Sequence, residues 1–137
     1  MTATQQLEQS GITYIPEPGA DPRTALYSDT ATTAGVVWTT QIPTAADGSI
    51  PEGIEAQTRQ VLDNLREALE RAGSSLDQVL HLTIYFTDLA ERTEFNALYR
   101  EYFPPPRPVR CALGVNQLGI PGMKVELTAT AAVAVTD

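Results

Sequence analysis

The chain has 137 residues, of which 42% are hydrophobic and 19% charged, a composition that suits one globular domain with a buried core. Nine Lys and Arg against seventeen Asp and Glu give a formal net charge of −8, which disfavours nucleic acid and anionic membranes as partners. The single cysteine, Cys111, excludes an intrachain disulfide, and the single histidine, His81, leaves too few ligands for a typical structural zinc site.

The N-terminal region combines a polar segment with short β-branched runs. Residues 1–11 are polar and show no periodicity, so they are predicted to form a flexible tail before a single domain that spans residues 12–135. Proline and glycine breaks then delimit three predicted strands, at residues 12–15, 26–30 and 36–42. The last two strands are expected to pair through a turn of small residues at Ala34 and Gly35.

The middle of the chain carries the helical signals. Apolar residues at three- and four-residue spacing predict a helix over residues 54–72, with Gly73 as its C-cap. Strict alternation predicts a strand over residues 79–87, with one apolar and one polar face. A second apolar stripe predicts a helix over residues 91–103, which ends at three consecutive prolines.

Two further strands complete the domain. They are expected at residues 109–118 and 124–135, joined by the Gly-Ile-Pro-Gly loop of residues 119–122. The resulting order, β-β-β-α-β-α-β-β, predicts an α+β fold in which two helices cover one face of a mixed sheet.

The other face of this sheet lacks a covering helix. Alternation assigns to it Thr39, Gln41, His81, Thr83, Tyr85, Arg110, Ala112, Gly114, Glu126, Thr128, Thr130 and Ala132. Such small and weakly charged side chains are not typical of a free surface, so we expect copies of the chain to associate through this face.

Arg110 and Glu126 are the candidate functional residues of this face, because charges are rare inside strands unless something binds them. The planar guanidinium of Arg110 suits a carboxylate, and Glu126 is able to position or deprotonate a water molecule. The alternative is a purely structural ion pair, formed between the two residues or with a neighbouring subunit.

Two C-terminal segments carry a family resemblance: residues 108–115 (Pro-Val-Arg-Cys-Ala-Leu-Gly-Val) and 124–131 (Lys-Val-Glu-Leu-Thr-Ala-Thr-Ala). They resemble the signature of the reactive intermediate deaminase family, also called RidA or YjgF. Further matching segments follow in the family's order, at residues 26–28, 40–43, 57–65, 86–89 and 95–99. The resemblance therefore covers nearly all of the predicted domain.

The resemblance implies a chorismate-mutase-like fold that assembles as a homotrimer, with three pockets between subunits. It also implies a cofactor-independent and metal-free enzyme that hydrolyses 2-enamine and 2-imine intermediates, such as 2-aminoacrylate and 2-iminobutanoate, to a keto acid and ammonia. A protonated imine is already electrophilic, so such a site has only to orient substrate and water and to move a proton.

Four residues match functional positions of the family. Arg110 matches the arginine that holds the substrate carboxylate, and Glu126 matches the glutamate that positions the attacking water. Tyr27 matches the tyrosine that lines the pocket, and Asn96 matches an asparagine near it. The resemblance therefore implies Arg110, Glu126 and Tyr27 as catalytic residues and Asn96 as a substrate-binding residue.

The chain departs from the family pattern at other pocket positions. Thr39 and Thr40 stand where many members have Ser-Gly, and Ala112 stands where a cysteine is frequent. All three are expected in the substrate-binding region, whereas alternation points Cys111 toward the core. Residues 119–122 are also expected near the pocket. These departures concern the choice of substrate more than the reaction.

Other residues have simpler interpretations. His81 is expected at a subunit interface, Trp38 in the core, and Arg107 as a solvated loop charge or a second cation at the pocket mouth. The net charge of −8 argues against ribonuclease activity, a label attached to some family members. A single cysteine and the absence of a basic, apolar leader predict a cytoplasmic protein without membrane association.

Two alternatives to the small-substrate deaminase stay open. One is a trimeric module that binds small metabolites or protects proteins without turning a substrate over. The other is a pathway-specific deaminase that acts on a bulkier enamine. Because Arg110 would serve all three, the sequence does not separate them.

Overall fold

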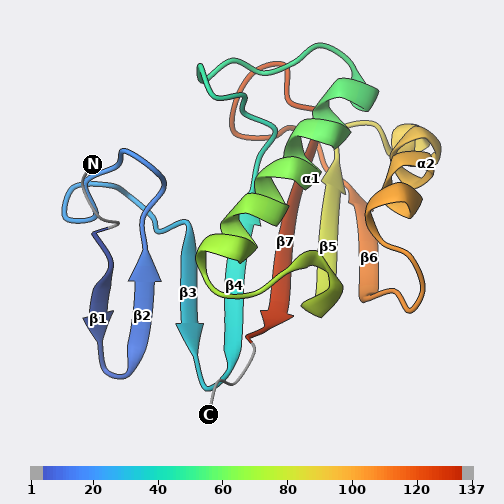
Figure 1. The fold of residues 1–137 in the computed structure, drawn as a ribbon. Coiled ribbons are helices and arrows are strands. Elements are labelled where there is room, and N and C mark those ends of the chain that lie inside the picture. Colours follow the sequence, from blue (N-terminus) through green and yellow to red (C-terminus); the bar gives the residue numbers. More distant parts are fainter. Residues whose placement is uncertain (1–4, 134–137) are drawn as a thin grey trace.

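One mixed sheet with two helices on one face organises the chain (Figure 1). The computed structural model describes residues 5–133. Its strands and helices are β1 (Leu7–Gln9), β2 (Ile12–Ile15), β3 (Thr30–Thr33), β4 (Val36–Gln41), α1 (Ile54–Arg71), β5 (Val79–Phe86), α2 (Arg92–Tyr102), β6 (Val109–Gly114) and β7 (Val125–Ala132). Short 3-10 turns at Leu76–Gln78 and Leu89–Glu91 precede β5 and α2.

The strands lie in the order β1-β2-β3-β4-β7-β5-β6. Neighbouring strands are antiparallel except for β5 and β6, which are parallel because the crossover through α2 connects them. The predicted α+β architecture, a mixed sheet with two helices on one face, is confirmed.

An N-terminal hairpin replaces part of the expected tail. Strand β1 pairs with β2, and Ser10 and Gly11 form the turn between them with φ values of 57° and 79°. Two positive φ values in a two-residue connection match the twist of a hairpin. The prediction of an unstructured tail is therefore wrong for residues 7–11, while residues 1–4 lie outside the described part of the chain.

Strand β3 begins at Thr30, so the strand predicted at residues 26–30 is wrong in its first four positions. The preceding loop turns at Asp21, whose carbonyl accepts hydrogen bonds from the Thr24 and Ala25 N–H groups. Leu26 at its tip is 98% exposed. The turn at Ala34 and Gly35, by contrast, joins β3 to β4 as predicted.

Helix α1 lies across β4 and β7 and buries its apolar stripe against them (Figure 1). Burying a leucine or valine side chain stabilises the fold by about 1.5–3 kcal/mol. Gly73 ends the helix as predicted: at φ 84° it donates to the Glu70 carbonyl while the Ser74 N–H reaches the Leu69 carbonyl. The core includes the fully buried Val37, Val61, Leu62, Leu65, Leu69, Leu82, Ile84, Phe86, Phe95, Val125 and Leu127.

A β-bulge alters the alternation at the start of β5. The register with β7 shifts between Val79 and His81, so Val79 is buried and Leu80 is 49% exposed. From Leu82 onward the strand alternates as predicted, with Leu82, Ile84 and Phe86 fully buried.

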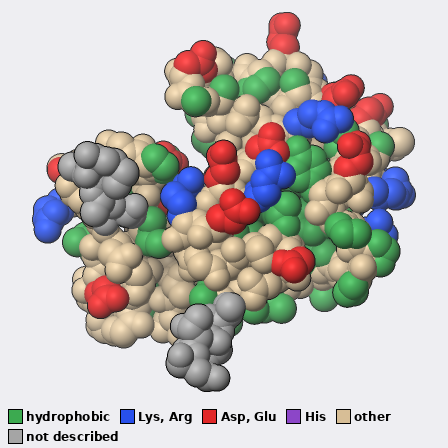
Figure 2. All heavy atoms as spheres, in the orientation of Figure 1, with side chains coloured by type: hydrophobic (Ala, Val, Ile, Leu, Met, Phe, Trp, Pro, Cys, Tyr) green, Lys and Arg blue, Asp and Glu red, His purple; other side chains and the backbone are tan. Residues whose placement is uncertain are grey.

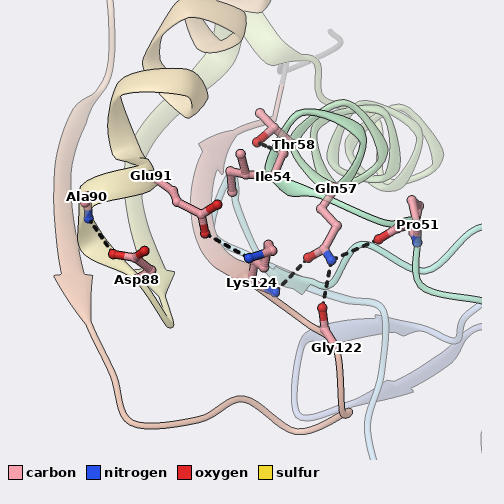
Figure 3. Close-up of polar contacts among 9 residues, drawn as sticks. All are labelled: Pro51, Ile54, Gln57, Thr58, Asp88, Ala90, Glu91, Gly122 and Lys124. Atoms are coloured by element: carbon pink, nitrogen blue, oxygen red, sulfur yellow. Dashed lines mark hydrogen bonds and ion pairs between the residues drawn. The ribbon is translucent and has the colours of Figure 1, made fainter.

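Gln57 ties the start of α1 to the segment that enters β7 (Figure 3). Its buried amide donates to the carbonyls of Pro51, at 2.9 Å, and Gly122, at 2.8 Å, and its oxygen accepts from the Lys124 N–H at 2.7 Å. The Lys124 ammonium extends the connection to Glu91, at 3.2 Å. These contacts fix where β7 begins, and with it the position of Glu126.

Candidate functional site

The register between β4 and β7 defines the open face, the side of the sheet without helices. Trp38 lies beside Thr130, and Thr40 beside Thr128, with their side chains on this face. Thr40 is therefore on the open face as predicted. Trp38 is 47% exposed there, so the prediction that it belongs to the core is wrong.

Thr39 and Gln41 lie on the opposite, helix-covered face and are 6% and 8% exposed. Their predicted place on the open face is wrong because both belong to a buried polar network around Asp29. Thr39 donates to the Asp29 carbonyl at 2.7 Å, and Gln41 to its carboxylate at 2.9 Å. Arg71 of α1 completes the network with an ion pair to Asp29 at 2.8 Å.

Arg110 lies on the helix-covered face, at the edge of the sheet. The parallel register puts it beside Leu82, whose side chain is fully buried under the helices. Its Nη2 donates to Asn96 Oδ1 at 2.6 Å, and its guanidinium carbon lies 4.6 Å from the centre of the Tyr99 ring. The predicted place of Arg110 on the open face is therefore wrong. On the covered side, α2 provides a hydrogen-bond acceptor, Asn96, and an aromatic ring, Tyr99, for its guanidinium.

The same register reverses three further predictions on β6, and the first concerns Gly114, which lies beside the buried Phe86 on the covered face instead of on the open face. Ala112 lies beside Ile84 and packs against the core, although it was expected on the open face. Cys111 lies beside Thr83 and is exposed on the open face, although it was expected to point toward the core. Strand β6 is an edge strand with a weakly alternating burial pattern, so its polarity does not reveal which face is covered.

A pocket of about 790 Å³ opens over the junction of β3, β4 and β7. We call it the open-face pocket. Thr40 lines this pocket from the open face. Thr39 also belongs to the lining, although its side chain is buried. Its other lining residues include Tyr14, Glu17, Tyr27, Trp38, Glu126, Thr128 and Thr130. Residues 119–122, expected near the pocket, do not belong to its lining.

Glu126 lies in the open-face pocket beside Tyr85 in the sheet register. Partial burial raises the pKa of its carboxyl group. Within residues 5–133 no side chain donates a hydrogen bond to this carboxylate and no Lys or Arg pairs with it. A half-buried carboxylate of this kind is a stronger base than a solvated glutamate and is free to accept a proton.

Tyr27 enters the same pocket from the loop before β3 and is 62% exposed. A hydrogen bond to Glu17, with smaller contributions from burial and from the charges of Glu17 and Asp29, raises the pKa of its hydroxyl group. Tyr27 therefore stays protonated at neutral pH. It lines the same pocket as Glu126.

Arg110 and Asn96 line a second, smaller pocket of about 290 Å³, together with Tyr99, Arg100, Arg107 and Pro108. We call it the arginine pocket. The structure thus brings Tyr27 together with Glu126, and Arg110 together with Asn96, but the two pairs do not meet within one chain. In the part of the chain that the structure describes, no group of three His, Cys, Asp or Glu side chains is placed to hold a metal ion.

The charged surface elsewhere is mixed. Figure 2 shows acidic and basic side chains intermingled over α1 on the helix-covered face, as is typical of a solvated surface. Of the helices within residues 5–133, neither has the length and apolar character that a membrane-spanning segment requires.

Comparisons with known proteins agree with this architecture. The family model described as endoribonuclease L-PSP matches residues 19–133. The chain is 36% identical over 105 residues to the mitochondrial protein mmf1 of Schizosaccharomyces pombe, covering 74% of this chain and 64% of the relative. It is 37% identical over 78 residues to the chloroplastic Reactive Intermediate Deaminase A of Arabidopsis thaliana, covering 57% of this chain and 41% of that protein. These matches span less than two thirds of either relative.

Solved structures extend the match to nearly the whole fold. The crystal structure of the yeast protein YEO7 is similar with a TM-score of 0.82 at 31% identity, covering 90% of this chain and 99% of that one. RidA from the Antarctic bacterium Psychrobacter sp. PAMC 21119 is similar with a TM-score of 0.76 at 27% identity, covering 80% and 90%. The chain therefore belongs to the endoribonuclease L-PSP family, which is also the YjgF or RidA family.

Proposed function

We propose that the protein is a hydrolytic deaminase of small 2-imino and 2-enamino acids, and that each active site is shared between two copies of the chain. One observation carries the proposal. The chain holds Arg110, whose guanidinium is oriented to bind a carboxylate, and Glu126, whose half-buried carboxylate is free to act as a base. The two residues lie on opposite faces of the same sheet.

Sharing of the site follows from this placement. Arg110 is at the edge strand β6 under α2, whereas Glu126 faces the open side of β7, so one substrate cannot touch both in a single chain. A cyclic homotrimer, the assembly implied by the family resemblance, would set the Arg110 edge of one copy against the open-face pocket of the next. Large apolar side chains exposed on or beside this face support its burial by another copy: Trp38, Leu80, Val109 and Leu113.

Arg110 is prepared to bind a carboxylate. Asn96 occupies one of its N–H groups, and the Tyr99 ring holds the guanidinium plane by a cation–π contact. The remaining N–H groups provide a planar fork that matches the two oxygens of a carboxylate. Because two contacts fix the guanidinium before the substrate arrives, little side-chain entropy is lost on binding.

The chemistry needs no covalent intermediate with the protein. An enamine first takes a proton at carbon and becomes the protonated imine. Glu126 then accepts a proton from water while the water oxygen bonds to the imine carbon, which gives a 2-amino-2-hydroxy acid. Glu126 returns its proton to the amino group. The C–N bond then breaks while Glu126 takes the proton of the new hydroxyl group, which leaves the keto acid and ammonia. Tyr27, whose hydroxyl stays protonated through its hydrogen bond to Glu17, borders this site.

Sequence-independent RNA binding has little support in this chain. The family description includes the word endoribonuclease. A net charge of −8 opposes the phosphate contacts that such binding requires. We expect no RNA degradation in a metal-free assay.

Keto-acid formation tests the proposal directly. 2-Aminoacrylate and 2-iminobutanoate are generated in situ by a dehydratase, and the rate is compared for the native protein, Arg110→Ala and the control Arg92→Ala, an exposed arginine on α2. We expect acceleration over the uncatalysed rate that is lost only in Arg110→Ala. No acceleration by the native protein with either substrate would contradict the proposal and favour a non-catalytic binding module.

A further inference from the structure

The arginine pocket concentrates positive charge in an acidic protein. Arg100, Arg107 and Arg110 line it, while Asp and Glu are absent from its lining. The whole chain has only nine Lys and Arg and a net charge of −8. Figure 2 shows basic side chains at the right-hand edge of the molecule, where Figure 1 places α2. Three arginines around about 290 Å³ supply more charge than one carboxylate neutralises.

Arg107 is oriented by the backbone. Its Nε donates to the Phe103 carbonyl at 2.7 Å, in the loop that leads from α2 to β6. Within residues 5–133, none of the three pocket arginines forms an ion pair with an acidic side chain. The guanidinium of Arg107 is thus anchored at one nitrogen and retains its terminal N–H groups for another acceptor.

Tyr99 supplies an independent sign of a missing ligand. The residue lines the pocket and is 4% exposed, yet its hydroxyl group has no hydrogen-bond partner among the described residues. Burial raises the pKa of this hydroxyl, so it remains a donor at neutral pH. Leaving a buried hydroxyl unpaired is unfavourable, and the charge of Arg110 acts on this same hydroxyl, so an anion held by Arg110 would lie close to it.

We propose that the arginine pocket binds substrates with two anionic groups: the 2-carboxylate on Arg110 and a side-chain carboxylate on Arg107. This inference rests on the proposed deaminase function and defines its substrate class as 2-imino and 2-enamino dicarboxylic acids. The two charges on such a substrate match two guanidinium groups that the protein itself leaves without acidic partners.

Calorimetric binding of the stable keto acids tests the ligand class without turnover. Oxaloacetate carries two carboxylates and 2-oxobutanoate carries one. We expect the native protein to bind oxaloacetate about tenfold more tightly than 2-oxobutanoate, and Arg107→Gln to abolish most of that preference. The control Arg92→Gln removes the same charge from an exposed position on α2 and should leave the preference unchanged.

Kinetics then connects the pocket to the reaction. The ratio of kcat/KM for 2-iminosuccinate to that for 2-iminobutanoate should exceed one and fall about tenfold in Arg107→Gln. Equal affinity for both keto acids, an unchanged ratio in Arg107→Gln, or dissociation of the assembly in that variant would overturn the inference. Turnover of neither imine, with the dicarboxylate preference intact in calorimetry, would instead remove the proposed function.

Discussion

Arg110 and Glu126 lie on opposite faces of the same sheet. The first is beside Leu82 under the helices, and the second is beside Tyr85 on the open face. In the proposed function, each of the two residues supplies one half of a site that is shared between two copies of the chain. Asn96 and Tyr99 hold the guanidinium of Arg110 in place. Partial burial raises the pKa of Glu126.

Replacing Glu126 with glutamine should separate binding from catalysis. Glu126→Gln keeps the shape of the side chain but removes the base, so kcat should fall by about 10²–10⁴-fold. Affinity for 2-oxobutanoate should stay near that of the native protein, because Arg110 holds the carboxylate. Parallel loss of turnover and binding, measured by steady-state kinetics and calorimetry, would show that Glu126 has a structural role instead.

The raised pKa of Glu126 predicts how activity and stability change with pH. As a base, Glu126 must be ionised, so kcat/KM should fall on the acid side at a higher pH than a solvated glutamate would require. Because its folded pKa exceeds the unfolded value, the native protein should lose stability relative to Glu126→Gln as the pH rises through the raised pKa.

Denaturant unfolding of the native protein and of Glu126→Gln across a range of pH measures this difference in stability. The gap in free energy of unfolding should open toward neutral pH and close below a pH of about 4, where the carboxyl group is protonated in both states. A constant gap over the whole range would contradict the assignment of a raised pKa.

Replacing Asn96 with alanine should weaken substrate binding, because Asn96 holds Arg110 in position. In Asn96→Ala the guanidinium loses its 2.6 Å contact, worth about 1.5–3 kcal/mol for a charged donor, so KM should rise about tenfold or more with a smaller effect on kcat. Thr93→Ala, at an exposed position on the same helix, is the control. Unchanged KM in Asn96→Ala would mean that Tyr99 alone holds the arginine in place.

Trp38 reports on the open face because it is the only tryptophan of the chain and is 47% exposed there. Burial by another copy predicts that Trp38→Glu dissociates the assembly, since an ionised side chain would be left in a dry interface. Ala56→Glu, which adds the same charge on the exposed side of α1, should leave the assembly intact. Light scattering at micromolar concentration distinguishes the two, and a monomeric native protein would contradict the expected assembly.

The sequence predicted the layers of the fold because periodicity is strong where burial is one-sided. Helix α1 and strand β7 illustrate this, since their apolar residues repeat at the spacing of their own structure. The hairpin of β1 and β2 was missed, although Ser10-Gly11 between two short runs is a recognisable turn signal.

The candidate site was harder to predict because polarity did not indicate which face of a strand is covered. Thr39 and Gln41 are polar but buried, since Asp29 and Arg71 satisfy their hydrogen bonds. Arg110 is charged but lies on the covered face, since α2 provides its partners. Which alternate residues of β4 and β6 face the helices depends on contacts with residues distant in sequence. The pattern of a single strand does not contain that information.

A mixture of two inactive variants tests the shared site most directly. Arg110→Ala retains Glu126, and Glu126→Gln retains Arg110, so co-expression places both native residues together in roughly a quarter of the sites of a randomly mixed cyclic assembly. We expect the mixture to recover about a quarter of the native activity with 2-iminobutanoate, while Arg110→Ala mixed with the double variant stays inactive. A mixture no more active than its separate components would contradict a site built from two copies of the chain.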